Sequence, residues 1–268
     1  MFKVIKNAVD FMVKYMIEYS DFAKVYDELM DNVPYEKWCE YIVSLLKEYG
    51  IEDGLITDLG CGSGTLTELL SKKGFDMIGI DLSTDMLDIA RNKSIANNSN
   101  TLYLNQDMRE FELYGTVKAI ISTCDSMNYI LDSDELIHVF KLVNNYLDPK
   151  GIFIFDLNTD YKYKSIGECV IAENRDDCSF IWENYYDEEE FINEYDLTLF
   201  LKCKDEKDEN LFEKHFERHT QRAYSLDEIK DFLTLAGMEF LCAYDAFTKD
   251  AVKDTSERIC IIARERGK

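Results

Sequence analysis

The chain has 268 residues, 46% of them hydrophobic, which suits one large domain or one domain with an insertion. Its 53 acidic and 30 basic residues give a net charge of −23, which argues against DNA or RNA as a default substrate because such a surface repels phosphate backbones. The charge mildly favours a neutral or cationic small molecule as substrate. The alternative is that it only keeps the protein soluble. No stretch approaches the roughly 20 apolar residues of a membrane helix, and we expect no membrane association.

The first 50 residues are predicted to be helical. Within residues 1–18, apolar side chains recur at helical spacing and indicate an amphipathic helix that packs on the protein or on a second copy. Residues 19–30 and 35–50 are also helix-like. Charged residues interrupt the N-terminal apolar pattern, which makes it a poor signal peptide. Because the eight cysteines include no C-x-x-C pair, we expect reduced thiols, a cytoplasmic location and no zinc site.

From residue 54, short apolar runs alternate with helix-like runs. Helices are predicted at 65–74, closed by Gly74, at 83–98, with Ser83 as N-cap, and at 132–147. Fully apolar strands that alternate with helices indicate a parallel sheet covered on both faces. The predicted strands are 54–60, 76–82, 101–108, 117–124 and 151–158.

The alternation stops between residues 160 and 224. Three runs there, 178–187, 190–203 and 210–224, have strand-like spacing and predict an antiparallel three-stranded insertion. In the middle run, one face is expected to carry Phe191, Tyr195, Leu197, Leu199 and Leu201. A helix at 225–238 follows, with Ser225 and Glu228 spaced as a capping box, and strands 239–247 and 258–265 close the sheet. The predicted divisions are therefore 1–50, 160–224, and a main domain of 51–159 with 225–268.

Three glycines, Gly60, Gly62 and Gly64, lie between the first strand and its helix. Such a turn directs backbone N–H groups toward a ligand, and glycine permits a positive φ and close approach. Asp58 precedes the loop and Asp81 ends the next strand, where a carboxylate accepts hydrogen bonds from ribose hydroxyls. The loop reads G-x-G-x-G, whereas a dinucleotide fingerprint reads G-x-G-x-x-G.

The motifs "DLGCGSG", "GIDLS" and "NQDM", in this order, resemble those of the class I S-adenosylmethionine-dependent methyltransferases over about residues 19–160 and the closing strands. The segments "YSDFAKVYDELM", "CDSMNYI" and "HTQRAYS" resemble a subgroup of small bacterial methyltransferases with an inserted β lid. Amino-sugar N,N-dimethyltransferases have the same layout. The resemblance implies a Rossmann-like, seven-stranded methyltransferase sheet, S-adenosyl-L-methionine as cofactor and S-adenosyl-L-homocysteine as product.

The resemblance assigns the cofactor-binding residues to the strand ends and to the helices before the sheet. Asp58 orients the loop or, through water, the α-amino group, Asp81 takes the ribose, and Asp107 takes the adenine amino group. The other positions contact the methionine tail or adenine, or fold over the cofactor: Tyr19, Tyr26, Gly60, Cys61, Gly62, Leu82, Met86, Met108 and Cys124. Core packing is the alternative for Cys61, Met86, Cys124 and the tyrosines.

The residues that bind the methyl acceptor are harder to predict from the sequence. Asp125, Asn128 and Tyr129 follow the fourth strand, at the edge where open α/β sheets bind ligands, and could face substrate. His219 and Arg222 match a family pattern beside the lid, so the catalytic candidates are Tyr129, His219 and Arg222. Trp182, Asn184 and Tyr186 share one strand face, which either roofs the pocket or packs on the sheet.

The sequence thus predicts a methyltransferase that modifies N or O of a small-molecule acceptor, as a monomer or homodimer. An RNA or protein methyltransferase is one alternative, which a basic patch around Arg218 and Arg222 would favour. A non-catalytic module that binds the cofactor to regulate a partner is another.

Overall fold

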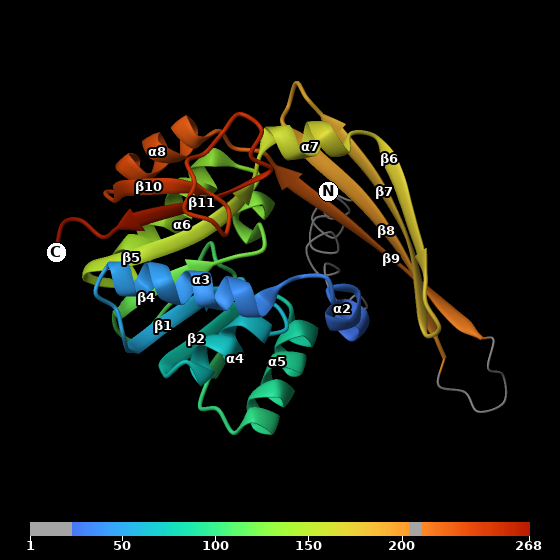
Figure 1. The fold of residues 1–268 in the computed structure, drawn as a ribbon, viewed down its shortest axis with the longest axis horizontal. Coiled ribbons are helices and arrows are strands. Elements are labelled where there is room, and N and C mark those ends of the chain that lie inside the picture. The colour runs from blue at the N-terminus through green and yellow to red at the C-terminus, as the bar shows by residue number, and fades with distance from the viewer. Residues whose placement is uncertain (1–22, 204–210) are drawn as a thin grey trace, which may run out of the picture.

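The structure is a computed structural model that describes residues 23–203 and 211–268, so Tyr19 and the helix predicted within 1–18 lie outside the described residues. Two sheets are present (Figure 1). One is the central sheet of the main domain, and the other extends from it beside helix α2 (Ala23–Leu29). Within the described ranges, no helix is long and apolar enough to cross a bilayer.

The central sheet has seven strands in the order β10-β11-β5-β4-β1-β2-β3. Strands β1 to β5 run parallel, and β11 lies antiparallel between β5 and β10. This order confirms the predicted Rossmann-like methyltransferase sheet. The strands are β1 (Gly54–Leu59), β2 (Phe75–Asp81), β3 (Leu102–Asn105), β4 (Val117–Ser122), β5 (Leu147–Asn158), β10 (Glu239–Asp245) and β11 (Arg258–Arg264).

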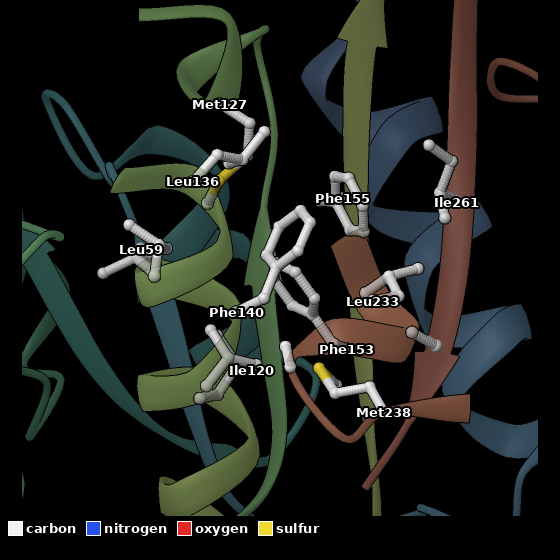
Figure 2. Close-up of a cluster of buried hydrophobic side chains, with 14 of the residues drawn as sticks. Leu59, Ile120, Met127, Leu136, Phe140, Phe153, Phe155, Leu233, Met238 and Ile261 are labelled. Atoms are coloured by element: carbon white, nitrogen blue, oxygen red, sulfur yellow. The ribbon is translucent and has the colours of Figure 1, made fainter. Parts of the chain in front are cut away.

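Helices cover both faces of this sheet because successive strand residues point to opposite sides. Ile120 packs toward α6 and α8, whereas Ile121 packs toward α3 and α4. On the α6 side, Phe153 stacks on Phe155 at 4.5 Å between ring centroids, and Phe140 contacts both (Figure 2). The helices are α2 (Ala23–Leu29), α3 (Tyr35–Glu48), α4 (Thr65–Lys72), α5 (Thr84–Asn97), the 3₁₀ helix η1 (Ser126–Tyr129), α6 (Ser133–Tyr146), α7 (Asp160–Ile166) and α8 (Leu226–Leu235).

The helix signals in the sequence are confirmed. Ser83 caps α5 by accepting a 3.3 Å hydrogen bond from the Met86 amide. The Ser225 side chain accepts from the Glu228 amide while the Glu228 carboxylate accepts from the Ser225 amide, which completes the capping box of α8. Strand β5 starts at Leu147 rather than at 151, because its first residue pairs with Val117 ahead of an irregularity in the β4 ladder.

The second sheet, here called the inserted sheet, has four strands rather than the predicted three. It comprises, in order, β6 (Cys169–Asn174), β7 (Cys178–Asp187), β8 (Ile192–Lys202) and β9 (Phe212–Arg222). Strand β6 lies at the edge of this sheet, and most of its side chains are exposed. Its sequence has no polar–apolar alternation and therefore gives no strand signal, so the strand forms through its pairing with β7. Helix α7 was likewise not predicted. Phe191 precedes β8, with a φ of 58°, and so does not share the strand face with Tyr195.

The inner face of the inserted sheet is the one that carries Trp182, Tyr195 and His219. Residues of adjacent strands share a face when they pair directly, as Tyr195 does with His219. Helix α2 covers part of this face, where Val25 and Leu29 pack on Leu197 and its neighbours. The inner face is thereby held next to the carboxyl ends of the central strands (Figure 1).

Candidate active site

A cavity of about 410 Å³ lies at the carboxyl ends of the central strands, within the roughly 300–1,000 Å³ range of small-molecule sites. All the cofactor residues predicted within the described ranges line it, and Tyr129 lines it as well. These are Tyr26, Asp58, Gly60, Cys61, Gly62, Asp81, Leu82, Met86, Asp107, Met108 and Cys124. The structure thus brings together residues from five separate segments.

Asp81 is oriented by backbone amides at the end of β2. Its Oδ2 accepts from the Gly62 N–H and its Oδ1 from the Ser83 N–H, each at 2.8 Å. Burial raises the pKa of this carboxyl, and the amide hydrogen bonds oppose the rise. A carboxylate has about four lone-pair sites, so acceptor capacity beyond these amides remains for a ligand.

The glycine loop serves packing as well as ligand access. Gly62 has a φ of 52°, and a Cβ there would meet no atom of the described residues within 4 Å. Gly64, with a φ of 74°, lies so close to Tyr103 that a Cβ would approach its hydroxyl to 2.5 Å, and a Cβ on Gly60 would approach Ser126 Oγ to 2.7 Å. Among the three glycines, Gly62 therefore leaves open space next to the described residues. The absence of a side chain at Gly60 and Gly64 instead lets neighbouring side chains pack against the loop.

Asp58 is 2% exposed in β1, and its carboxylate accepts a 2.6 Å hydrogen bond from the Thr67 hydroxyl. Burial raises its pKa to about 7, an effect that the Thr67 hydrogen bond opposes. A group that titrates near neutrality therefore lines the cavity beneath the glycine loop.

Asp107 has a partner that the sequence reasoning missed. The Arg109 amide donates to its Oδ1 at 2.8 Å, and the Arg109 Nε lies 3.0 Å from both carboxylate oxygens. These hydrogen bonds lower the pKa of Asp107 despite its partial burial. Any amino group bound by Asp107 must share this carboxylate with Arg109. The one-residue spacing in "QDMRE" was a signal that could have indicated the pair.

Helix α2 is fastened to the glycine loop through Asp27. One carboxylate oxygen accepts from Ser63 Oγ at 2.6 Å, and the other lies 2.6 Å from Lys93 Nζ on α5. Lys93 also donates to Thr65 Oγ1 at 2.6 Å. These contacts hold Tyr26, the neighbour of Asp27, in the wall of the cavity.

Comparison with known proteins decides the family. Residues 56–151 match a methyltransferase domain family. A methyltransferase-family protein of Geobacillus sp. (strain WCH70) is 34% identical over 249 residues, which cover 92% of this chain and 99% of the relative. The chain belongs to the class I S-adenosylmethionine-dependent methyltransferases.

One solved structure supports the same family, and a second, more distant one supports the fold. A S-adenosylmethionine-dependent methyltransferase from Clostridium acetobutylicum is 30% identical with a TM-score of 0.82, covering 93% of this chain and 99% of that one. DesVI of Streptomyces venezuelae, an amino-sugar N,N-dimethyltransferase, has a TM-score of 0.72 at 18% identity, covering 94% and 99%. The latter shares the fold, which confirms the layout predicted from the sequence.

Tyr129, predicted to lie on the acceptor side, joins the cavity to the inserted sheet. Its hydroxyl lies 2.7 Å from the Tyr195 hydroxyl on β8 and 3.1 Å from His219 Nδ1 on β9. Fully buried His219 has its Nε2 3.4 Å from an oxygen of Glu217, which is itself 2% exposed. Neither Tyr195 nor Glu217 was predicted as a site residue from the sequence. A signal for Glu217 was present, because it lies two residues before His219 in a strand and so shares its face.

The other acceptor-side candidates lie elsewhere in the methyltransferase. Arg222 does not line the cavity, since it donates to the Leu131 carbonyl at 3.0 Å and its guanidinium lies 4.9 Å from the Tyr224 ring. Fully buried Asn128 donates to the carbonyls of Asn158 and Arg222. Asp125 forms an ion pair instead of facing the cavity, as described below.

Proposed function

We propose that this methyltransferase transfers a methyl group to a nitrogen or oxygen atom of a small molecule, with Tyr129 and His219 taking up the acceptor's proton and Glu217 stabilising the charged histidine. The observation that carries the proposal is the double position of Tyr129. It lines the cofactor cavity and is hydrogen-bonded to His219 of the inserted sheet. The central sheet and the inserted sheet would then build one reaction site together.

The cavity residues fit S-adenosylmethionine, which supplies an electrophilic methyl group on a sulfonium when bound. The remaining acceptor capacity of the Asp81 carboxylate suits the ribose hydroxyls. Leu82, Met86 and Met108 offer apolar surface for adenine. The open space at Gly62 leaves room for the methionine tail, and Asp58 is the proposed partner of its α-ammonium.

The hydrogen-bonded group can move a proton away from the acceptor. The Glu217 carboxylate beside Nε2 favours a proton on that nitrogen of His219, which leaves Nδ1 to accept from Tyr129. The Tyr129 oxygen then accepts the proton of the incoming N–H or O–H group as its own proton passes to His219. Glu217 stabilises the resulting imidazolium, as a buried carboxylate does for other catalytic histidines.

The surface charges support a small-molecule acceptor over RNA. The arginines that a basic patch would need are occupied by acidic partners. Arg218 lies 2.6 Å from Asp196, and Arg222 lies 3.8 Å from Glu228. With a net charge of −23, the protein is poorly suited to phosphate backbones.

The proposed function is tested by incubating the protein with S-adenosylmethionine that carries a labelled methyl group and an extract of small metabolites. Label should appear in one or a few small products, together with S-adenosylhomocysteine. Label that appears only in RNA or protein would contradict the acceptor class. Cofactor binding without transfer to any extract, together with a tightly co-purifying partner, would favour the regulatory module.

Asp81→Ala should weaken binding of S-adenosylmethionine by roughly 10- to 150-fold, or about 1.5–3 kcal/mol, the usual range for hydrogen bonds to a charged group. The variant removes the ribose acceptor and the partner of the Gly62 amide. Titration calorimetry measures the change. Asp88→Ala, on an exposed position of α5 outside the cavity lining, is the matched control and should bind normally. Equal affinity of both variants would reject the ribose assignment.

Cofactor affinity should rise as the pH increases toward 7. In the free protein, Asp58 is protonated below its pKa of about 7, and a bound α-ammonium favours the carboxylate, so binding at lower pH releases a proton. The dissociation constant should fall by up to about tenfold per pH unit and level off near pH 7, before the ammonium titrates at about pH 7.7–8.0.

Calorimetry in buffers with different ionisation enthalpies counts the released protons. Asp58→Asn should bind with little pH dependence between pH 5.5 and 7, because its side chain cannot titrate. The α-ammonium assignment fails when the wild type and this variant show the same pH profile.

A further inference from the structure

The turn between β4 and η1 has an unusual backbone. Cys124 and Asp125 have φ values of 58° and 53°, in the left-handed region that side chains other than glycine rarely adopt. Cys124 lines the cofactor cavity, and Tyr129 follows at the end of η1. The conformation of this turn therefore sets one wall of the cavity and the position of Tyr129. Because it is costly, the surrounding structure must hold it.

The central sheet holds the turn through two charged side chains. Asp156 of β5, 1% exposed, accepts the Cys124 N–H at 3.1 Å and the Asp125 N–H at 2.7 Å. Arg258, the first residue of β11, donates to Asp156 at 2.8 Å and also to the Asp125 carboxylate. The guanidinium thus bridges the carboxylate that binds the turn and the carboxylate that belongs to it.

The inserted sheet holds the same turn from the other side. Gln221 of β9, 2% exposed, donates through Nε2 to Asp125 Oδ2 at 2.6 Å. Its Oε1 accepts a 2.9 Å hydrogen bond from the Tyr163 hydroxyl of α7, which orients the amide. Both groups belong to the insertion, and neither Gln221 nor Tyr163 lines the cofactor cavity.

We propose that Gln221 is a positioning residue through which the inserted sheet sets the conformation of the Cys124–Asp125 turn, and with it the cofactor site. The proposal rests on the proposed function in one respect, that the cavity binds S-adenosylmethionine. Its consequence is energetic coupling. An acceptor that changes the packing of the inserted sheet changes cofactor affinity, and the cofactor changes acceptor affinity by the same factor.

The test begins with Gln221→Ala, which removes the hydrogen bond from the inserted sheet to Asp125 and leaves the ion pair of Asp125 with Arg258 in place. The dissociation constant of S-adenosylmethionine should rise by about tenfold, the size expected for loss of one hydrogen bond to a charged group. Hydrogen exchange of the Cys124 and Asp125 amides should accelerate as well. These amides bind Asp156, so their exchange reports on the turn without any ligand.

A glycine at the turn separates positioning from packing. Glycine adopts a positive φ readily, so the turn should need Gln221 less when residue 124 is glycine. The double variant of Gln221→Ala with Cys124→Gly should therefore bind the cofactor almost as well as Cys124→Gly alone. Loss of packing between the sheets would not be repaired by this change. Arg218→Ala, on the outer face of the same strand, is the control and should leave affinity and exchange unchanged.

Two results would overturn the proposal. One is normal cofactor affinity and normal exchange in Gln221→Ala. The other is reduced affinity that the added glycine does not restore, with no faster exchange at the turn, which would make Gln221 a packing residue only. A wild-type protein that binds no S-adenosylmethionine would instead reject the proposed function and the coupling, and the exchange rates would still decide whether Gln221 holds the turn.

Discussion

Tyr129→Phe should lower the rate of methyl transfer by about 10²–10⁴-fold, the usual contribution of a positioned proton acceptor. The variant removes one oxygen atom, and with it the connection between the acceptor and His219 Nδ1. The Tyr129 hydroxyl has no assigned role in cofactor binding, so the dissociation constant of S-adenosylmethionine should stay close to that of the wild type. The loss is therefore expected in kcat, measured with the acceptor identified by the labelled-methyl screen.

Combined variants show whether the three side chains act as one unit. His219→Gln should cost about as much as Tyr129→Phe, and the double variant little more than either alone, because each breaks the same proton path. Glu217→Gln should have a smaller effect of the same kind, since it leaves the path intact but no longer stabilises an imidazolium.

Tyr185→Phe is the matched control, because Tyr185 is 53% exposed on the outer face of the inserted sheet. It should turn over the acceptor like the wild type. Full activity of Tyr129→Phe, or losses in the single variants that multiply in the double variant, would refute the proton path.

Arg258→Ala should destabilise the protein by about 3–5 kcal/mol, the usual cost of breaking a buried ion pair from one side. The change leaves the carboxylates of Asp125 and Asp156 close together without the guanidinium that pairs with both. Burial already raises the pKa of Asp156, and the guanidinium and two backbone amides oppose this rise. Removing the guanidinium should raise this pKa further. The destabilisation should therefore be largest at alkaline pH and shrink as the pH falls and the carboxyl binds a proton.

Denaturant-induced unfolding at several pH values measures this loss. Arg264→Ala is the matched control, because Arg264 lies at the other end of β11 in a partly exposed pair with Glu239 at 3.7 Å. It should cost no more than about 1 kcal/mol. Adding Asp156→Asn to Arg258→Ala should recover part of the stability by removing one of the two unpaired charges. Equal losses in the two arginine variants would show that the buried cluster contributes no more than a surface pair.

Much of the central sheet and the cofactor side was predictable because its signals are local. A buried parallel strand is apolar throughout, and a residue that ends such a strand lies at the ligand edge whatever the rest of the chain does. Asp58, Asp81 and Gly62 could be placed in this way. The caps at Ser83 and Ser225 are also local, since each involves an amide three residues along the chain.

The acceptor side depends on contacts between distant segments, which local patterns do not contain. The alternation in β9 predicts that His215 and His219 share a face, but not that this face meets Tyr129, 90 residues away from His219. Strand β6 forms only because it can pair with β7. Arg222 binds the Leu131 carbonyl because its strand face points away from the cavity. The left-handed turn at Cys124 depends on Asp156, Arg258 and Gln221 together. Burial of these charges becomes favourable only once three strands from two sheets have come together.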